Sequence, residues 1–159
     1  MILDLLSNTP LYVYWIFFSF LFVGIIQTKK REQNITKALV IPFVLIFFSI
    51  YAFIHDFGID FLSLFSWISG IVFVVIMNTF IKSQNYVQYS STNKIFIIDG
   101  SYLPLFMMML LFFTKYSVTA LNLIGSTVIE TALYIILVCL LYGIFSGMYM
   151  IRFLILIQK

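Results

Sequence analysis

Long apolar stretches alternate with short polar ones along this chain, and their lengths predict five membrane-crossing helices. A helix needs about 20 predominantly apolar residues to cross a bilayer, and five stretches come near that length. They cover residues 10–26, 37–54, 59–81, 101–121 and 127–152. The pattern therefore predicts a single transmembrane helical bundle over residues 1–159.

A polar stretch, residues 82–100, separates the third and fourth predicted helices. Val87–Ser90 and Lys94–Ile98 are short runs typical of strands, and Ser91-Thr92-Asn93 between them can form a turn. We expect a short β-hairpin in this loop. The predicted fold class is an all-α integral membrane protein with five transmembrane helices and this hairpin-like loop.

Composition supports the same class and excludes most others. Hydrophobic residues make up 63% of the chain and charged residues only 9%, whereas an average soluble domain has about 25% charged residues. So few charged side chains cannot cover the surface of a water-soluble globule. A soluble enzyme, a nucleic-acid-binding protein and a disordered tail are excluded, and the lipid bilayer is the expected partner.

The lysines and arginines predict an orientation, because these residues accumulate in cytoplasmic loops. Eight of the nine fall on one side of the predicted bundle: Lys29, Lys30, Arg31, Lys37, Lys82, Lys94, Arg152 and Lys159. The opposite side has acidic residues and no cation: Asp4, Asp56, Asp60 and Glu130. The N-terminus is therefore expected outside, and the C-terminus and the hairpin in the cytoplasm.

A series of short motifs follows a definite order along the chain. They are Thr9-Pro10 with Trp15, Gln27, Pro42, Trp67 with Gly70, Gly100-Ser101-Tyr102 with Pro104-Leu105, Lys115-Tyr116, Tyr142-Gly143-Ile144-Phe145-Ser146-Gly147, and Arg152. Together they resemble a family of small bacterial multi-span membrane proteins known only as a domain of unknown function. The chain has Asp99 where that family usually has Pro, and Tyr102 where it usually has Trp. The resemblance implies a bacterial inner-membrane protein and brings no activity or catalytic residue.

Lys115 is the most informative single position, because it is the one cation that lies away from the ends of the predicted helices. It follows Ser101 by 14 residues, which is ~21 Å along a helix in a hydrocarbon core ~30 Å thick. A bare ammonium group near the centre costs ~2.5 kcal/mol or more. The side chain can extend to the outer interface, can pair with Glu130 across a helix hairpin, or can face an anionic ligand.

Small residues recur at fourfold spacing on the last predicted helix, at Cys139, Gly143 and Gly147. The two glycines form a small-xxx-small motif, which lets two helices approach closely. The motif predicts either packing within the chain or a seam between two copies of it. Cys139 is interpreted as a packing residue, since its helix has no histidine to activate a thiolate.

His55, Asp56 and Asp60 cluster near the outer end of the second predicted helix. Carboxylates and imidazole can bind a divalent metal ion, but a solvated loop is the usual outcome for such a cluster. We expect no metal site and no cofactor. A haem held by two histidines is excluded because the chain has a single histidine.

The predicted helices contain no pair of a nucleophile and a base, no pair of catalytic acids and no set of metal ligands. We therefore do not expect the protein to be an enzyme. The favoured function is small-ligand binding or transport by a homo-oligomer in the inner membrane, with Lys115 holding an anionic group. One alternative is an accessory or assembly subunit that contacts another membrane protein through Gly143 and Gly147. Another is an intramembrane enzyme that acts on lipid.

Overall fold

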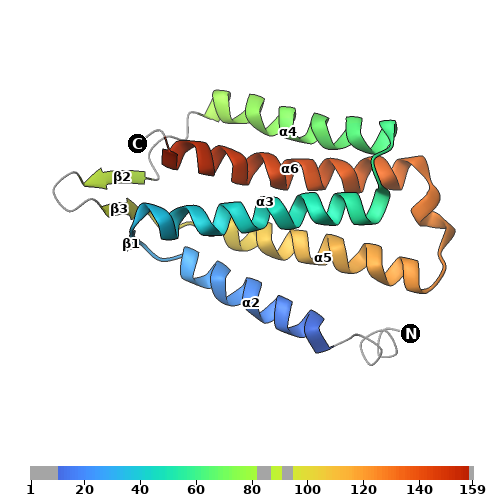
Figure 1. Cartoon of the computed structure of the whole chain (residues 1–159), viewed down its shortest axis with the longest axis horizontal. Coiled ribbons are helices and arrows are strands. Elements are labelled where there is room, and N and C mark those ends of the chain that lie inside the picture. Colours follow the sequence, from blue (N-terminus) through green and yellow to red (C-terminus); the bar gives the residue numbers. More distant parts are fainter. Residues whose placement is uncertain (1–10, 82–86, 91–94, 158–159) are drawn as a thin grey trace.

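The computed structural model describes residues 11–81, 87–90 and 95–157. Five α-helices lie side by side along the long axis of the molecule (Figure 1). They are α2 (Leu11–Gln27), α3 (Ile35–Phe57), α4 (Phe61–Ile81), α5 (Leu103–Leu123) and α6 (Ala132–Ile157). The predicted helical bundle is confirmed.

Four of these helices, α3 to α6, are long and apolar enough to cross a membrane. Helix α2 is also apolar, but its apolar part, Val13–Gln27, is shorter. Residues 1–10, which include the proline predicted to begin this helix, lie outside the described residues. Four of the five predicted segments therefore form helices that are long and apolar enough to span a membrane.

Helix α3 is longer than predicted, and the difference matters for the site. The hydropathy pattern ended this helix at residue 54, whereas the structure continues it to Phe57. Gly58 ends the helix with a φ of 69°, and its N–H donates to the carbonyl of Ile54. A positive φ is easily adopted only by glycine. His55 and Asp56 are therefore in the last turn of a helix and not in a loop.

The last helix begins later than predicted. Residues 127–130 form a short 3-10 helix, η1 (Thr127–Glu130), and α6 begins at Ala132. The Ser126 hydroxyl accepts a hydrogen bond from the N–H of Val128, which favours a separate turn here. Glu130 therefore lies at the end of this turn and is exposed.

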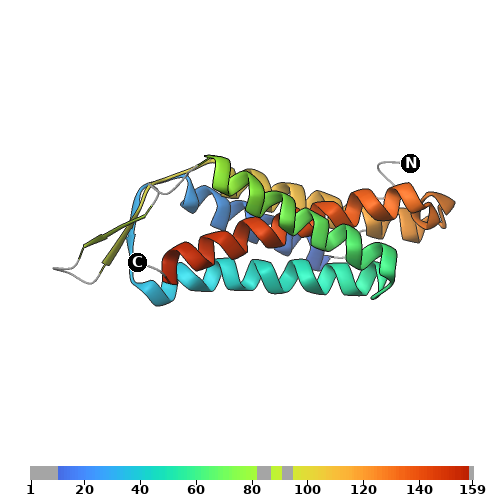
Figure 2. The same ribbon diagram turned by 90° about the horizontal axis from the view of Figure 1, so that it is seen from above.

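A three-stranded antiparallel sheet extends beyond one end of the bundle, the end where the C-terminus lies (Figure 2). Its strands are β1 (Arg31–Gln33), β2 (Val87–Ser90) and β3 (Ile95–Ile98), in the order β1-β3-β2. Strand β1 comes from the basic loop between α2 and α3, and the sequence did not predict it because its three polar residues have no strand pattern. The predicted turn at 91–93 lies outside the described residues.

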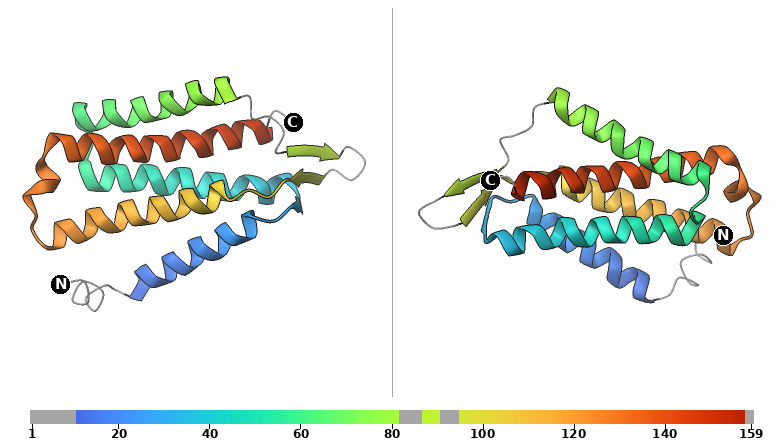
Figure 3. Two further views of the ribbon diagram at one scale, coloured as in Figure 1. Left: turned by 180° about the vertical axis from the view of Figure 1, so that it is seen from behind. Right: turned by 45° about the horizontal axis from the view of Figure 1, so that its top comes forward.

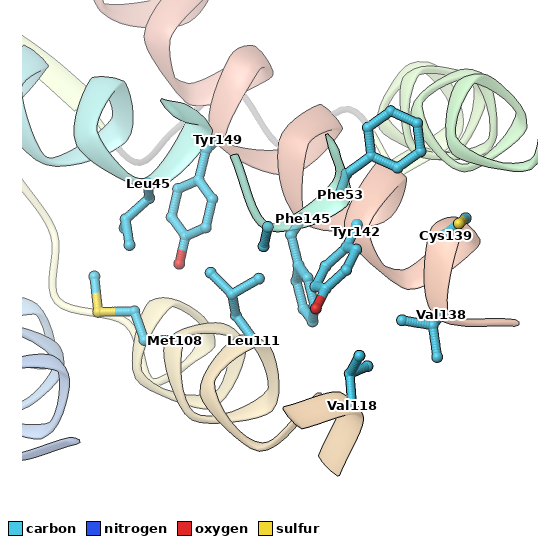
Figure 4. Close-up of a cluster of buried hydrophobic side chains, with 11 residues drawn as sticks. Leu45, Phe53, Met108, Leu111, Val118, Val138, Cys139, Tyr142, Phe145 and Tyr149 are labelled. Atoms are coloured by element: carbon cyan, nitrogen blue, oxygen red, sulfur yellow. The ribbon is translucent and has the colours of Figure 1, made fainter. Parts of the chain in front are cut away.

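Helix α6 is the centre of the packing. It packs along both α3 and α4, while α2 packs along α5. Figure 3 shows α4 and α2 at the two edges of the bundle. Side chains from α3, α5 and α6 converge in one apolar cluster (Figure 4): Leu45, Ala52, Phe53, Met108, Leu111, Val118, Val138, Cys139, Tyr142, Phe145 and Tyr149.

The glycine stripe of α6 faces α4 of the same chain. A Cβ atom added to Gly143 would collide with the carbonyl oxygen of Trp67, and one added to Gly70 would lie 2.9 Å from the backbone nitrogen of Ile144. At Gly147 the nearest atoms would lie at 3.2 Å, which is tight but closer to ordinary contact. The backbones of α4 and α6 therefore touch at Gly70 and Gly143.

We expect Gly143→Ala to separate α4 from α6 and to destabilise the bundle by about 1–3 kcal/mol, which is typical of overpacking. The single cysteine, Cys139, is fully buried on α6. Heating the detergent-solubilised protein with a thiol-reactive dye therefore reports unfolding. The midpoint of labelling should fall by several degrees in Gly143→Ala and by less in the matched variant Gly147→Ala.

A Gly143→Ala variant that labels like the wild type would contradict this packing. If the same variant instead changed the oligomeric state without changing thiol exposure, the stripe would be a seam between copies.

Candidate functional site

A buried carboxylate joins three helices at the end of the bundle opposite the sheet. Asp56 of α3 accepts a hydrogen bond from the ammonium group of Lys115 on α5. The Tyr142 hydroxyl of α6 donates to the other carboxylate oxygen, at 3.0 Å. His55 Nδ1 lies 3.1 Å from the oxygen that Lys115 contacts. We call Asp56, Lys115, Tyr142 and His55 the Asp56 cluster.

Burial differs sharply across the Asp56 cluster. The Asp56 side chain is only 3% exposed and that of Lys115 22%, while that of His55 is 63% exposed. Removing two charges from water is costly, and their attraction compensates only when further hydrogen bonds satisfy the remaining atoms. Tyr142 and His55 supply such bonds to Asp56. The pair is therefore a closed, electrically neutral unit with one exposed group beside it.

Helical spacing explains why Asp56 and Lys115 face inward. Asp56 follows the buried residues Ser49 and Ala52 by seven and four positions, which places all three on one face of α3. Lys115 follows Leu111 by four and precedes Val118 by three, and both of these are fully buried. The charged residues therefore continue the apolar faces of their helices, and packing of those faces brings them together.

The ion pair corrects one expectation. Lys115 was expected to extend to the interface, pair with Glu130 or face a ligand, and it pairs with Asp56. Within the part of the chain that the structure describes, Glu130 makes no ion pair with it. The alternative of a pair with Glu130 assumed that Glu130 lies inside the last helix, whereas the structure places it in the 3-10 turn before that helix. Asp56 was missed as the partner because α3 was expected to end before it.

The three residues considered for a metal are not brought together. His55 and Asp56 are neighbours in α3, while Asp60 lies beyond the Gly58 turn and is exposed. The Asp60 N–H donates to Ser63 at the start of α4. Among residues 11–81, 87–90 and 95–157, no three His, Cys, Asp or Glu side chains lie close enough together to hold a metal ion.

The Asp56 cluster continues into the bundle as a short polar chain. The Ser49 hydroxyl donates to the carbonyl oxygen of Tyr142, at 2.9 Å. The Ser146 hydroxyl donates to that of Ser49, at 3.1 Å. Both serines are buried between α3 and α6. Sequence analysis missed them, although Ser49 lies two helical turns before Asp56 and Ser146 one turn after Tyr142.

Tyr134 adds an unused polar group near the same site. It lies two turns before Tyr142 on α6, and its ring centroid is 6.5 Å from that of Phe57. Its side chain lies within electrostatic reach of Asp56. The hydroxyl is buried and has no hydrogen-bond partner. A buried hydroxyl left without a partner costs about 1–3 kcal/mol, so this one is free to bind a ligand or a water molecule.

Comparison with known proteins places the chain in one family. Residues 1–158 match a family of unknown function, DUF6622. The chain belongs to this family. No curated protein and no solved structure matches it. Family membership thus agrees with the resemblance to an uncharacterised family and supplies no activity, so the chemistry of the site has to be argued from its geometry.

We expect Asp56→Asn and Lys115→Met each to destabilise the protein by about 3–5 kcal/mol, because each leaves a buried charge without its partner. The double variant should lose less than the sum of the two. The midpoint of Cys139 labelling on heating measures all three. Asp60→Asn is the matched control, since it removes an exposed carboxylate at the same end. Strictly additive losses would show that the two charges do not interact.

Proposed function

We propose that the protein transports a small monovalent anion together with one proton, and that the Asp56–Lys115 pair is the binding site. The observation that carries the proposal is the burial of this pair between three apolar helices. Ionisable residues inside membrane-spanning segments are rare, costly and usually functional. A purely structural role would be served more cheaply by apolar side chains of similar volume.

Charge neutrality determines the stoichiometry. In the closed state the negative Asp56 neutralises the positive Lys115. When Asp56 binds a proton, Lys115 loses its counter-ion and leaves a net positive charge in a low-dielectric site, which is unfavourable. An anion bound to Lys115 restores neutrality. The two states of low energy are therefore the empty ion pair and the site loaded with one proton and one anion.

The neighbouring residues have roles consistent with this cycle. His55 is the exposed member of the Asp56 cluster and contacts the oxygen that Lys115 shares, so it can pass a proton between water and Asp56. Tyr142 holds the second carboxylate oxygen. The unpartnered Tyr134 hydroxyl supplies a hydrogen-bond donor for the anion. These few polar groups form a thin lining, which favours an oligomer as the working unit.

The accessory-subunit alternative receives less support. It placed a partner protein on Gly143 and Gly147, and α4 of the same chain covers both positions.

Liposomes that contain the purified protein and an internal pH dye test the transport proposal. Addition of chloride, nitrate, methanesulfonate or lactate outside should acidify the interior, at a rate that a potassium–valinomycin voltage clamp does not change, because the exchange is electroneutral. Asp56→Asn and Lys115→Met should abolish the protein-dependent signal, while Asp60→Asn should retain it. A wild type as silent as protein-free liposomes across the panel would contradict the proposal.

The proposed orientation has the N-terminus outside and the C-terminus in the cytoplasm of a bacterial inner membrane. The basic loop 28–34 and Arg152 lie at the sheet end, and the acidic residues Asp60 and Glu130 lie at the opposite end. This distribution supports the orientation, because lysines and arginines accumulate on the cytoplasmic side. In a Cys139→Ser background, a membrane-impermeant maleimide should label Asp60→Cys in intact cells and Lys29→Cys only after permeabilisation. The opposite result would reverse the orientation.

A further inference from the structure

A second cationic site lies at the sheet end of the bundle, remote from the Asp56 cluster. Arg31 begins strand β1 and is paired in register with Ile98 of β3. The same end includes Arg152 in the last turns of α6. Ile98 packs in turn in a small apolar cluster with Ala38, Leu39 and Ile155. The backbone of Arg31 is therefore attached through β3 to this end of the bundle.

The Arg31 guanidinium has donors that nothing in the described chain satisfies. Its Nε and Nη1 atoms are buried and have no hydrogen-bond partner. The nearby ion pair between Lys30 and Asp99, at 3.8 Å, is formed by exposed side chains and does not include Arg31. A buried charged donor without an acceptor is strongly unfavourable. The described residues therefore leave these two nitrogen atoms in need of an acceptor.

The positive charge of Arg152 makes the unsatisfied position of Arg31 more unfavourable. Burial, and secondarily the positive charge of Arg152, lower the pKa of Arg31 from its ordinary value. An arginine remains protonated at neutral pH even so, so Arg31 keeps its positive charge and its need for an acceptor. An anion bound to Arg31 would supply the missing acceptors and would also weaken the repulsion from Arg152.

The surroundings of Arg152 indicate which anion fits. Arg152 lines an apolar hollow between the start of α5 and the end of α6, together with Leu103, Pro104, Met107, Met148 and Tyr149. An apolar hollow lined by a guanidinium group at the end of apolar helices matches a phospholipid, whose phosphate meets positive charge while its acyl chains lie along the helices. Phosphate also offers several oxygens to the donors of a guanidinium group.

We infer that Arg31 is the centre of a binding site for a phosphate group, supplied by an anionic phospholipid or by free phosphate, and that the positive charge of Arg152 adds to the attraction. The inference does not rest on the transport proposal, because it uses other residues at the other end of the bundle. Lys29 and Lys30 are exposed on the same loop and increase the local concentration of anions. Bound phosphate would hold β1, and with it the sheet, against α6.

Native mass spectrometry of the full-length protein in detergent, titrated with phosphatidylglycerol or phosphatidylcholine, tests the inference. The wild type should prefer phosphatidylglycerol, and Arg31→Gln should weaken its binding roughly tenfold, as expected for the loss of one charge-assisted contact. The matched control Lys29→Gln removes the same charge from an exposed neighbour and should change affinity by less than about twofold. Equal losses in the two variants would indicate surface electrostatics only and would overturn the site.

A competition arm separates the two sources of phosphate. If inorganic phosphate displaces phosphatidylglycerol from the wild type and itself raises the midpoint of Cys139 labelling, free phosphate is the ligand. If phosphatidylglycerol raises the midpoint and inorganic phosphate does not, the ligand is the lipid. Failure of both to raise it, or an equal rise in Arg31→Gln, would contradict the inference. Should Arg31→Gln fail to fold, Arg31→Lys keeps the charge and should still lose most of the affinity.

Discussion

A charged side chain within a bundle of apolar helices has to find a partner, and this constraint organises the Asp56 cluster. Lys115 continues the buried face of α5, and its side chain is only 22% exposed. Asp56 meets it only because α3 continues to Phe57 before Gly58 turns the chain. Tyr142 then completes the site from the central helix. One ion pair thus connects the positions of α3, α5 and α6.

Helix α6 makes close backbone contacts on one face and side-chain contacts on another. Its glycine face allows the α4 backbone to approach more closely than any side chain would permit. Its other buried face carries Tyr142, Phe145 and Tyr149, which fill the space toward α3 and α5. Close backbone packing compensates for the weak driving force between apolar helices in lipid, while the aromatic face leaves room for hydroxyl groups. The polar chain of Ser49 and Ser146 lies on this second side.

The two ends of the bundle have opposite electrostatic character. At one end a carboxylate and an ammonium group neutralise each other within the helices. At the other end Arg31 and Arg152 accumulate positive charge beside a small sheet, and the described chain offers the Arg31 guanidinium no acceptor for two of its nitrogens. At the first end the charges satisfy each other, whereas at the second end two nitrogen atoms of Arg31 are left without an acceptor among the described residues. Each arrangement follows from the cost of leaving a buried charge unsatisfied.

The class of the protein could be predicted from the sequence alone, because apolar runs of about 20 residues admit few structures besides membrane-spanning helices. The sequence also identified Lys115, since a lysine inside such a run is conspicuous. It could not identify Asp56 as the partner, because a helix end depends on a single turn at Gly58, and the hydropathy of residues 55–57 is equally compatible with a loop. Strand β1 was likewise hidden, since three polar residues become a strand only when β3 lies beside them. Local hydropathy decides which segments are helical, but the partner of a charge or of a strand is decided by which segments pack together, and that depends on contacts between residues far apart in the chain.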